Sequence, residues 1–119
     1  MNIKPTHSNK RTIKTLLLIL KNPLGLSEEN IKEVLPQKSP RNIYSRLRKE
    51  YSIEYDKIKS TNPNTGTRWS IYFLPSSLEA HKLVSVIIAK SNKYGIEVGC
   101  EDNLRALADA FPEIRNVAA

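Results

Sequence analysis

The chain has 119 residues, a formal net charge of +7 at pH 7, an apolar content of 39% and a mean hydropathy of −0.43. This length fits one domain, or a small domain with an appended element, and the only strongly apolar run, residues 15–20, is too short to cross a bilayer. The single cysteine, Cys100, cannot form an internal disulfide, so we expect a cytoplasmic protein. We also expect neither a signal peptide nor a membrane segment.

The positive charge is concentrated in the first two thirds of the chain. Up to Pro75 the sequence holds 14 Lys and Arg against 6 Asp and Glu, and from Ser76 onward it holds 5 against 6. A basic module joined to a neutral segment indicates that one part meets a polyanion such as nucleic acid. Basic surfaces also occur without such a partner, and the charge alone leaves both explanations open.

Residues 1–9 are expected to form a flexible arm, followed by a first helix from about residue 9 to residue 21. Its apolar residues recur at helical spacing: Ile13, Leu16, Leu17 and Leu20. The helix should end at Asn22, because the residue before a proline is disfavoured in the α conformation. The connector over residues 24–26 either links two helices or supplies a short β-bridge.

A second and a third helix are predicted on either side of a short turn. Ser27 is a suitable N-cap for the second helix, and Pro36 closes it. Its inward face consists of Ile31, Val34 and Leu35. Ser39 and Pro40 then occupy the cap and the first position of the third helix. Two capped helices joined by so short a turn are typical of a helix-turn-helix.

The third helix, residues 40–51, has two contrasting faces. The apolar face consists of Ile43, Tyr44, Leu47 and Tyr51. The opposite side is polar and mainly basic, and consists of Arg41, Asn42, Ser45, Arg48 and Lys49, with Arg46 on a flank.

Two strands are predicted next, over residues 53–59 and 67–74, with a loop rich in Pro, Asn and Gly between them. In the second strand apolar and other side chains alternate, as expected for a half-buried strand. The alternating residues are Trp69, Ile71 and Phe73 against Ser70 and Tyr72. The pattern predicts a β-hairpin directly after a basic helix.

The C-terminal third is predicted to be helical. Ser76 and Glu79 form a capping box for a fourth helix that reaches about residue 93, and Gly95 is a suitable C-cap. Residues 96–98 are expected to be extended, and a last helix runs from residue 101 to Pro112. The fourth helix carries apolar residues on more than one face.

The segment N-I-Y-S-R-L-R-K-E-Y-S-I, residues 42–53, resembles the recognition helix of bacterial, phage and plasmid winged helix-turn-helix DNA-binding proteins. The segment T-G-T-R-W-S-I-Y-F, residues 65–73, resembles their returning wing strand, and the order of elements is similar to that of the PadR-like repressors. The resemblance covers about residues 10–74 and implies an α+β, mostly helical fold of three helices plus a β-hairpin wing. We therefore expect a winged helix-turn-helix domain over residues 10–75 and a C-terminal helical extension over residues 76–119.

In such a fold the third helix enters the DNA major groove and the wing touches the flanking backbone. The candidates for reading base edges are Arg41, Asn42, Ser45 and Lys49. Arg46 and Arg48 are expected to hold phosphates, or to pair with Glu50 or other nearby acids. The alternative for all of these residues is an ordinary solvated helix face.

The wing candidates for phosphate or minor-groove contact are Lys57, Lys59, Asn62, Asn64, Thr65 and Arg68. The alternative for them is a soluble, mobile loop tip. For Trp69, packing in the core is favoured over stacking on bases, because it alternates with Ile71 and Phe73.

Catalytic and metal sites are disfavoured. His7 and His81 have no Cys, His or carboxylate partner at a usable sequence spacing, and no motif surrounds Cys100, which we expect to be a buried or incidental thiol. The sequence has no glycine-rich phosphate loop and no carboxylate cluster. We expect no enzyme, no cofactor and no bound metal.

The expected function is sequence-specific binding of double-stranded DNA by a transcriptional regulator, for example a repressor of phage, plasmid or bacterial origin. The alternatives are an origin- or centromere-binding protein for replication or partition and, more distantly, a winged protein–protein module. A homodimer is expected through Leu83, Val84, Ile87 and Ile88, since one small domain covers only one face of the fourth helix. The alternative is that the last helix, with Leu104, Leu107 and Phe111, folds back and covers the second face within one chain. The operator, the sign of regulation, any effector and the role of residues 95–119 do not follow from the sequence.

Overall fold

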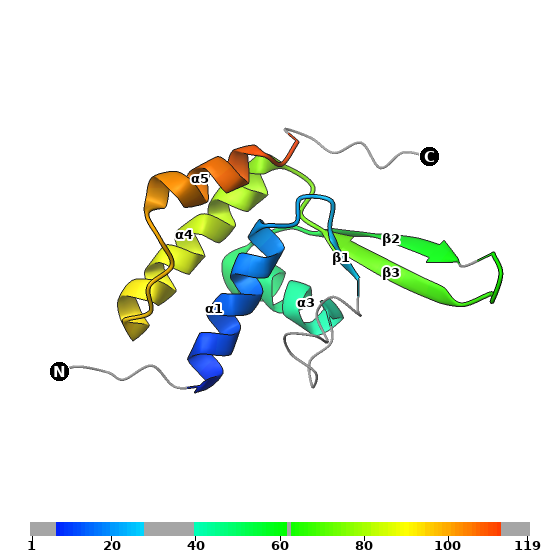
Figure 1. The fold of residues 1–119 in the computed structure, drawn as a ribbon, viewed down its shortest axis with the longest axis horizontal. Helices are drawn as coiled ribbons and strands as arrows, with labels where there is room; N and C mark the ends of the chain where they lie inside the picture. Colours follow the sequence, from blue (N-terminus) through cyan, green and yellow to red (C-terminus); the bar gives the residue numbers. More distant parts are fainter. Residues whose placement is uncertain (1–6, 28–39, 62, 113–119) are drawn as a thin grey trace.

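The computed structural model describes residues 7–27, 40–61 and 63–112. In chain order these form α1 (His7–Leu20), β1 (Leu26–Ser27), α3 (Pro40–Tyr51), β2 (Asp56–Thr61), β3 (Arg68–Phe73), α4 (Ser77–Tyr94) and α5 (Glu101–Asp109). The helices gather into one body, and β2 and β3 extend away from it as a hairpin (Figure 1). The described part is thus a small α+β fold, mostly helical, with a three-stranded antiparallel sheet.

Helix α1 buries one apolar side, which consists of Ile13, Leu16, Ile19 and Leu20. It begins at His7, slightly before the predicted start, so the arm expected over residues 1–9 is partly helical and otherwise lies outside the described residues. The helix ends at Leu20, one residue before its predicted end. The Asn22 side-chain amide donates to the carbonyl of Leu18 at 2.6 Å, which satisfies an acceptor that a helix C-terminus leaves unpaired.

The connector after α1 brings the chain against the hairpin. Gly25 has φ 107°, and a Cβ there would lie 2.7 Å from the carbonyl oxygen of Tyr72, so only glycine fits this approach. Leu26 then pairs with Tyr72, and Ser27 with Ile71, in an antiparallel register. The predicted β-bridge is confirmed, at residues 26 and 27. The second helix predicted after it, with Ile31, Val34 and Leu35, and the turn to Ser39 lie outside the described residues.

Helix α3 has the predicted bounds and packs its apolar face on the sheet. Tyr44 is buried, stacks on Tyr72 with ring centroids 5.5 Å apart and meets Tyr55 at the same distance. Its hydroxyl donates to the carbonyl of Tyr72 at 3.3 Å, and burial raises the pKa of Tyr44 well above its ordinary value. Tyr44 of α3, Tyr55 just before β2 and Tyr72 of β3 therefore join the helix to the root of the hairpin.

The turn out of α3 depends on Ser52, which has φ 57°, in the left-handed region. There its backbone N–H donates to the carbonyl of Arg48, and the N–H of Ile53 donates to that of Leu47. Ile53 is fully buried as a result. The left-handed conformation costs a non-glycine residue about 1–2 kcal/mol, so Ser52 holds the turn under strain.

We expect Ser52→Gly to stabilise the fold by up to about 1 kcal/mol, since relief of this strain exceeds the added chain entropy of glycine. Urea denaturation of both proteins measures the difference. The matched control is Ser45→Gly, because Ser45 is exposed within α3, where glycine should destabilise by about 0.5 kcal/mol. A loss of stability in both variants would contradict the left-handed turn.

Strand β2 starts at Asp56 rather than at the predicted residue 53, because Ile53 is needed in the turn and in the core. The hairpin register pairs Lys57 with Tyr72, Lys59 with Ser70 and Thr61 with Arg68. Tyr72 and Phe73 are both buried, so the end of β3 is covered on both faces instead of alternating. The side chain of Trp69 lies outside the described part, and its predicted packing stays a prediction.

Helix α4 has the predicted caps. Ser76 accepts from the backbone N–H of Glu79, and Gly95 ends the helix in the left-handed conformation with φ 64°. The other half of the predicted capping box is wrong, because the Glu79 carboxylate turns to a different partner. It accepts from the N–H of Glu54 at 2.8 Å and from Lys82 Nζ at 3.0 Å, so this buried carboxylate ties α4 to the turn before the hairpin.

Helix α5 folds back on α4, and residues 96–98, for which an extended conformation was predicted, belong to neither a helix nor a strand. Its inward residues are Leu104, Ala108 and, just beyond its end, Phe111. The carbonyl of Pro112 accepts from the N–H of Ser77 at 2.7 Å, so the chain after α5 returns to the first turn of α4 (Figure 1).

This arrangement changes the basis for the predicted homodimer. Leu83, Val84 and Ile87 have no exposed surface in the single chain, and Ile88 is half-buried. α5 and α1 both pack on α4, so the second apolar face is covered from within the chain. This is the alternative to the dimer, in which the last helix covers the second face, so Leu83, Val84 and Ile87 offer no surface for an interface. A homodimer stays a prediction, with no surface assigned to it.

Candidate nucleic-acid interface

The side of α3 that faces away from the sheet is exposed and basic. Its exposed residues are Arg41, Asn42, Ser45, Arg46, Arg48 and Lys49. Tyr44 and Leu47, on the opposite side, are buried, which fixes the rotation of the helix. All six residues predicted for the recognition helix thus lie on its accessible surface.

The two flanking arginines differ in how firmly they are held. Arg46 pairs with Glu50 at 3.3 Å, and both side chains are largely exposed, so the pair is weak and easily exchanged for another anion. Arg48 is bound three times. Its guanidinium contacts the Glu54 carboxylate at 3.0 Å and the Tyr55 carbonyl at 3.1 Å, and lies 4.2 Å from the centre of the Tyr55 ring. These arginines were predicted either to hold phosphates or to pair with nearby acids, and both pair with an acid.

The hairpin carries its cations on one face. Directly opposed residues of an antiparallel pair project to the same side, and side chains alternate along a strand. The register therefore places Lys57, Lys59 and Arg68 on one face together with Ser70. All three cations are exposed, as are Asn64 and Thr65 in the loop, whereas Asn62 lies outside the described residues.

The loop between the strands is ordered by short contacts of its own. The Thr65 hydroxyl lies 2.9 Å from that of Thr67 and also accepts from the backbone N–H of Thr67. Gly66 has φ 72°, and a Cβ there would meet nothing, so glycine serves the turn rather than a close contact. The hydroxyl of Thr65, which was predicted to contact DNA, therefore makes its hydrogen bonds within the loop.

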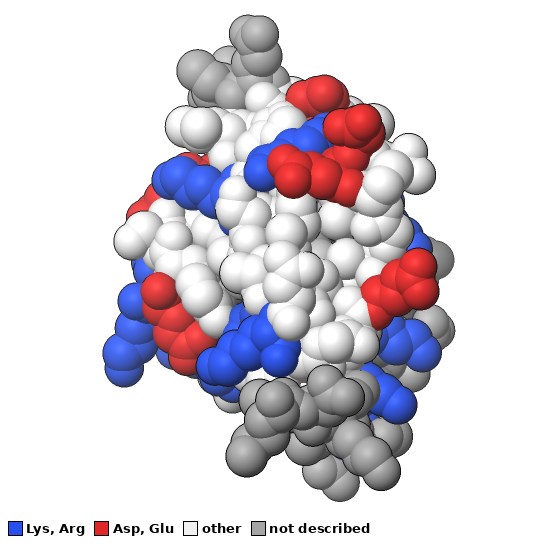
Figure 2. Space-filling view, turned by 90° about the vertical axis from the view of Figure 1, so that its left-hand side faces the viewer, with Lys and Arg blue, Asp and Glu red and all other residues white. Residues whose placement is uncertain are grey.

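Charge balance favours an anionic partner for this part of the molecule. Residues 40–73 contain seven Lys and Arg against three Asp and Glu. Two of the acids, Glu50 and Glu54, pair with arginines, and the third, Asp56, accepts from the N–H of Lys57. By contrast, the end of the molecule away from the hairpin has uncharged residues at its centre, with both signs around its rim (Figure 2).

The remaining histidine and cysteine have other surroundings. His81 Nε2 lies 2.7 Å from Asp109, and Arg105 lies 3.2 Å from His81 Nδ1, so the three residues connect α4 to α5. Sequence spacing did not show this carboxylate partner of His81, because Asp109 lies on another helix. Cys100 is exposed at the N-cap of α5, and does not occupy a buried site.

Within the described residues, no group of three His, Cys, Asp or Glu side chains is close enough to hold a metal ion. In the same residues, no helix combines the length and the apolar character needed to span a bilayer.

Sequence reasoning missed two residues that organise this region. Tyr55 supports Arg48 from the start of the hairpin, and Glu79 holds the turn before it. An aromatic residue seven positions after an arginine carries no local pattern. Glu79 had a recognisable capping motif, but that motif does not show its long-range partner.

No protein-family model, curated protein or solved structure matches this chain. Its function is therefore inferred from the geometry of the described residues.

Proposed function

We propose that this chain binds double-stranded DNA as a winged helix-turn-helix domain, with α3 in the major groove and the β2–β3 hairpin as the wing. The observation that carries the proposal is the juxtaposition of two exposed basic surfaces, one on α3 and one on a single face of the hairpin that follows it. A major groove about 12 Å wide admits one helix. The part of the protein beside that helix then contacts the phosphates that flank the groove.

The order and pairing of the elements support the winged arrangement. β1 pairs with β3 at the edge of the hairpin, and the Tyr44–Tyr72 stack holds α3 against the sheet. Contacts from Arg48 to Glu54 and Tyr55 add a second connection between the helix and the start of the hairpin. A rigid link between the two basic surfaces lets both meet one duplex without a large ordering cost.

The biological role that we propose is transcriptional regulation. A genome-wide footprint of the bound protein tests it, since a regulator occupies promoters, whereas a replication or partition protein occupies an origin or centromere. Occupancy confined to an origin would overturn the regulatory role and leave DNA binding intact.

The wing predicts a uniform electrostatic effect. Lys59→Ala and Arg68→Ala should each weaken binding to all duplexes alike and lower the slope of log affinity against log salt by about one unit. Fluorescence anisotropy on two unrelated duplexes over a range of salt concentrations measures this. The control is Lys21→Ala, which removes the same charge from the exposed end of α1. A change confined to one sequence, with the slope intact, would mean that the wing reads bases instead.

A further inference from the structure

A groove lies beside α3, on the flank away from the hairpin. Its volume is about 500 Å³, and its walls come from three helices. Thr12 and Thr15 belong to α1, Arg46 and Lys49 to α3, and Lys90 to α4. Lys90 comes from the C-terminal helical part, outside the basic region that the sequence predicted to bind DNA.

The two flanks of α3 follow from its rotation. At 100° per residue, Arg48 and Arg46 lie on opposite sides of the exposed face. Arg48 reaches Tyr55 at the root of the hairpin, so that flank is the wing side. Arg46 lines the groove, so the groove occupies the other side. Three residues between them on the exposed face also line the groove: Asn42, Ser45 and Lys49.

The groove is electropositive, and one of its cations is held in place. Arg46, Lys49 and Lys90 line it, against the acid Glu50, which pairs with Arg46. Lys90 Nζ lies 5.5 Å from the centre of the Tyr51 ring and 6.0 Å from that of Tyr94. Two aromatic faces therefore orient the ammonium group at the groove wall, while the half-buried side chain lies on apolar surface.

We propose that this groove binds a phosphate of the DNA backbone, so that the duplex is held on both flanks of α3, by the wing on one side and by Lys90 on the other. This inference rests on the proposed function. A helix in the major groove has a sugar–phosphate strand on each side, and the wing reaches only one of them. Positive charge, a preoriented ammonium group and a position beside the exposed face of α3 match the second strand.

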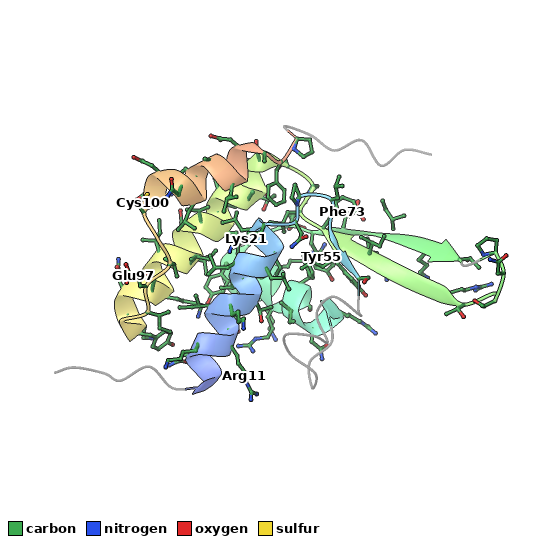
Figure 3. All side chains as sticks on the ribbon, viewed as in Figure 1. Arg11, Lys21, Tyr55, Phe73, Glu97 and Cys100 are labelled. Carbon is green, nitrogen blue, oxygen red and sulfur yellow. The ribbon has the colours of Figure 1, made fainter. Side chains whose placement is uncertain are left out.

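The test compares Lys90→Gln with Lys21→Gln, which remove the same charge. Lys21 lies at the opposite end of α1 from Arg11 and does not line the groove (Figure 3). Lys90→Gln should lower the salt slope by about 0.9 unit, so the loss of affinity between about 50 and about 200 mM salt becomes about threefold smaller. Lys90→Arg should retain the parental slope, and Lys21→Gln should leave it unchanged. Circular dichroism verifies that each variant is folded.

Equal effects of Lys90→Gln and Lys21→Gln would overturn the groove assignment, since net charge alone would then explain them. A second arm titrates the free protein with inorganic phosphate and follows the backbone amides of Thr12 and Lys90 by NMR. Suppose that these amides show saturable shifts and that Lys90→Gln does not change the salt slope of duplex binding. The groove would then bind free phosphate, and its assignment to the DNA backbone would be overturned. If the unchanged chain binds no duplex, the proposed function itself fails; if it binds and Lys90→Gln has no effect, only the groove assignment fails.

Discussion

Replacing Phe111 by alanine should lower the free energy of unfolding by about 3–5 kcal/mol, the range for a buried aromatic residue cut back to Cβ. Phe111 is 3% exposed and belongs to the same buried cluster as Leu83, Val84 and Ile87 of α4. Its backbone N–H donates to the carbonyl of Ala108, which holds it at the end of α5. Removal of the ring leaves a cavity between the last helix and the rest of the core. Urea denaturation measures the loss.

Two further variants make this result specific. Leu78→Ala, on the exposed side of α4, should change stability by less than about 0.5 kcal/mol, because Leu78 is 65% exposed. Phe111→Leu keeps an apolar side chain in the same space and should cost clearly less than Phe111→Ala. Equal, small effects of Phe111→Ala and Leu78→Ala would show that α5 does not cover α4 in solution.

The variants of Phe111 and Leu78 also test whether the chain forms a dimer through α4. If α5 covers α4, light scattering of the intact chain should show no dimer built on Leu83, Val84 and Ile87, since these side chains have no exposed surface. A dimer that survives substitution of Leu78 and of Ile88 would require a surface that does not depend on these two side chains. A dimer whose formation tracks the loss of α5 packing in Phe111→Ala would instead restore the interface predicted from the sequence.

Local signals in the sequence predicted most of the elements. Pro40 at a first helical position, Ser76 as an N-cap and Gly95 as a C-cap each depend on neighbours within one helical turn, and all three lie where expected. The hairpin followed from strand alternation and a loop rich in turn-forming residues, and its two strands are confirmed with shifted ends. Such features depend on nearby backbone geometry, which a short stretch of sequence specifies.

The errors arose where distant residues meet. The Glu79 carboxylate holds the N–H of Glu54, 25 positions away, and His81 pairs with Asp109, 28 positions away. Tyr72 reads as the polar side of a strand but is buried under Tyr44. Whether α5 covers α4 was left open by the sequence, because it depends on how a loop directs the chain. None of these contacts leaves a periodic pattern in the sequence.

The candidate site likewise has features that the sequence predicted and features that it did not. Helical rotation alone predicted which α3 residues are exposed, and the structure agrees for all six. Rotation did not predict that Arg48 is held by Glu54 and Tyr55, nor that Lys90 of α4 shares a groove with Arg46. Arg48 is therefore a weaker candidate for a phosphate contact than Arg46, whose single partner is exposed.

The strongest functional effect is expected at the N-terminal half of the exposed face of α3. Arg41→Ala and Asn42→Ala should each cost about 1–3 kcal/mol of binding to the preferred site and relax the base preference at one position. Both side chains are exposed, and the first turns of a recognition helix lie deepest in the major groove. The preferred site is first obtained by selection from a randomised duplex library. Anisotropy titrations at one fixed salt concentration then compare that site with single-base variants of it.

Each control removes the same kind of side chain as the test substitution, an amide or a positive charge, but from outside α3. Asn103→Ala removes an exposed amide from α5, and Lys21→Ala removes a charge from the end of α1. Both should leave the ratio of affinities for preferred and altered sites unchanged. Removing a side chain of α3 that binds a base lowers that ratio, whereas removing one that binds a phosphate lowers both affinities alike. If Arg41→Ala and Asn42→Ala stay folded and keep the parental ratio, α3 does not read the bases, and the proposed docking of this helix is wrong.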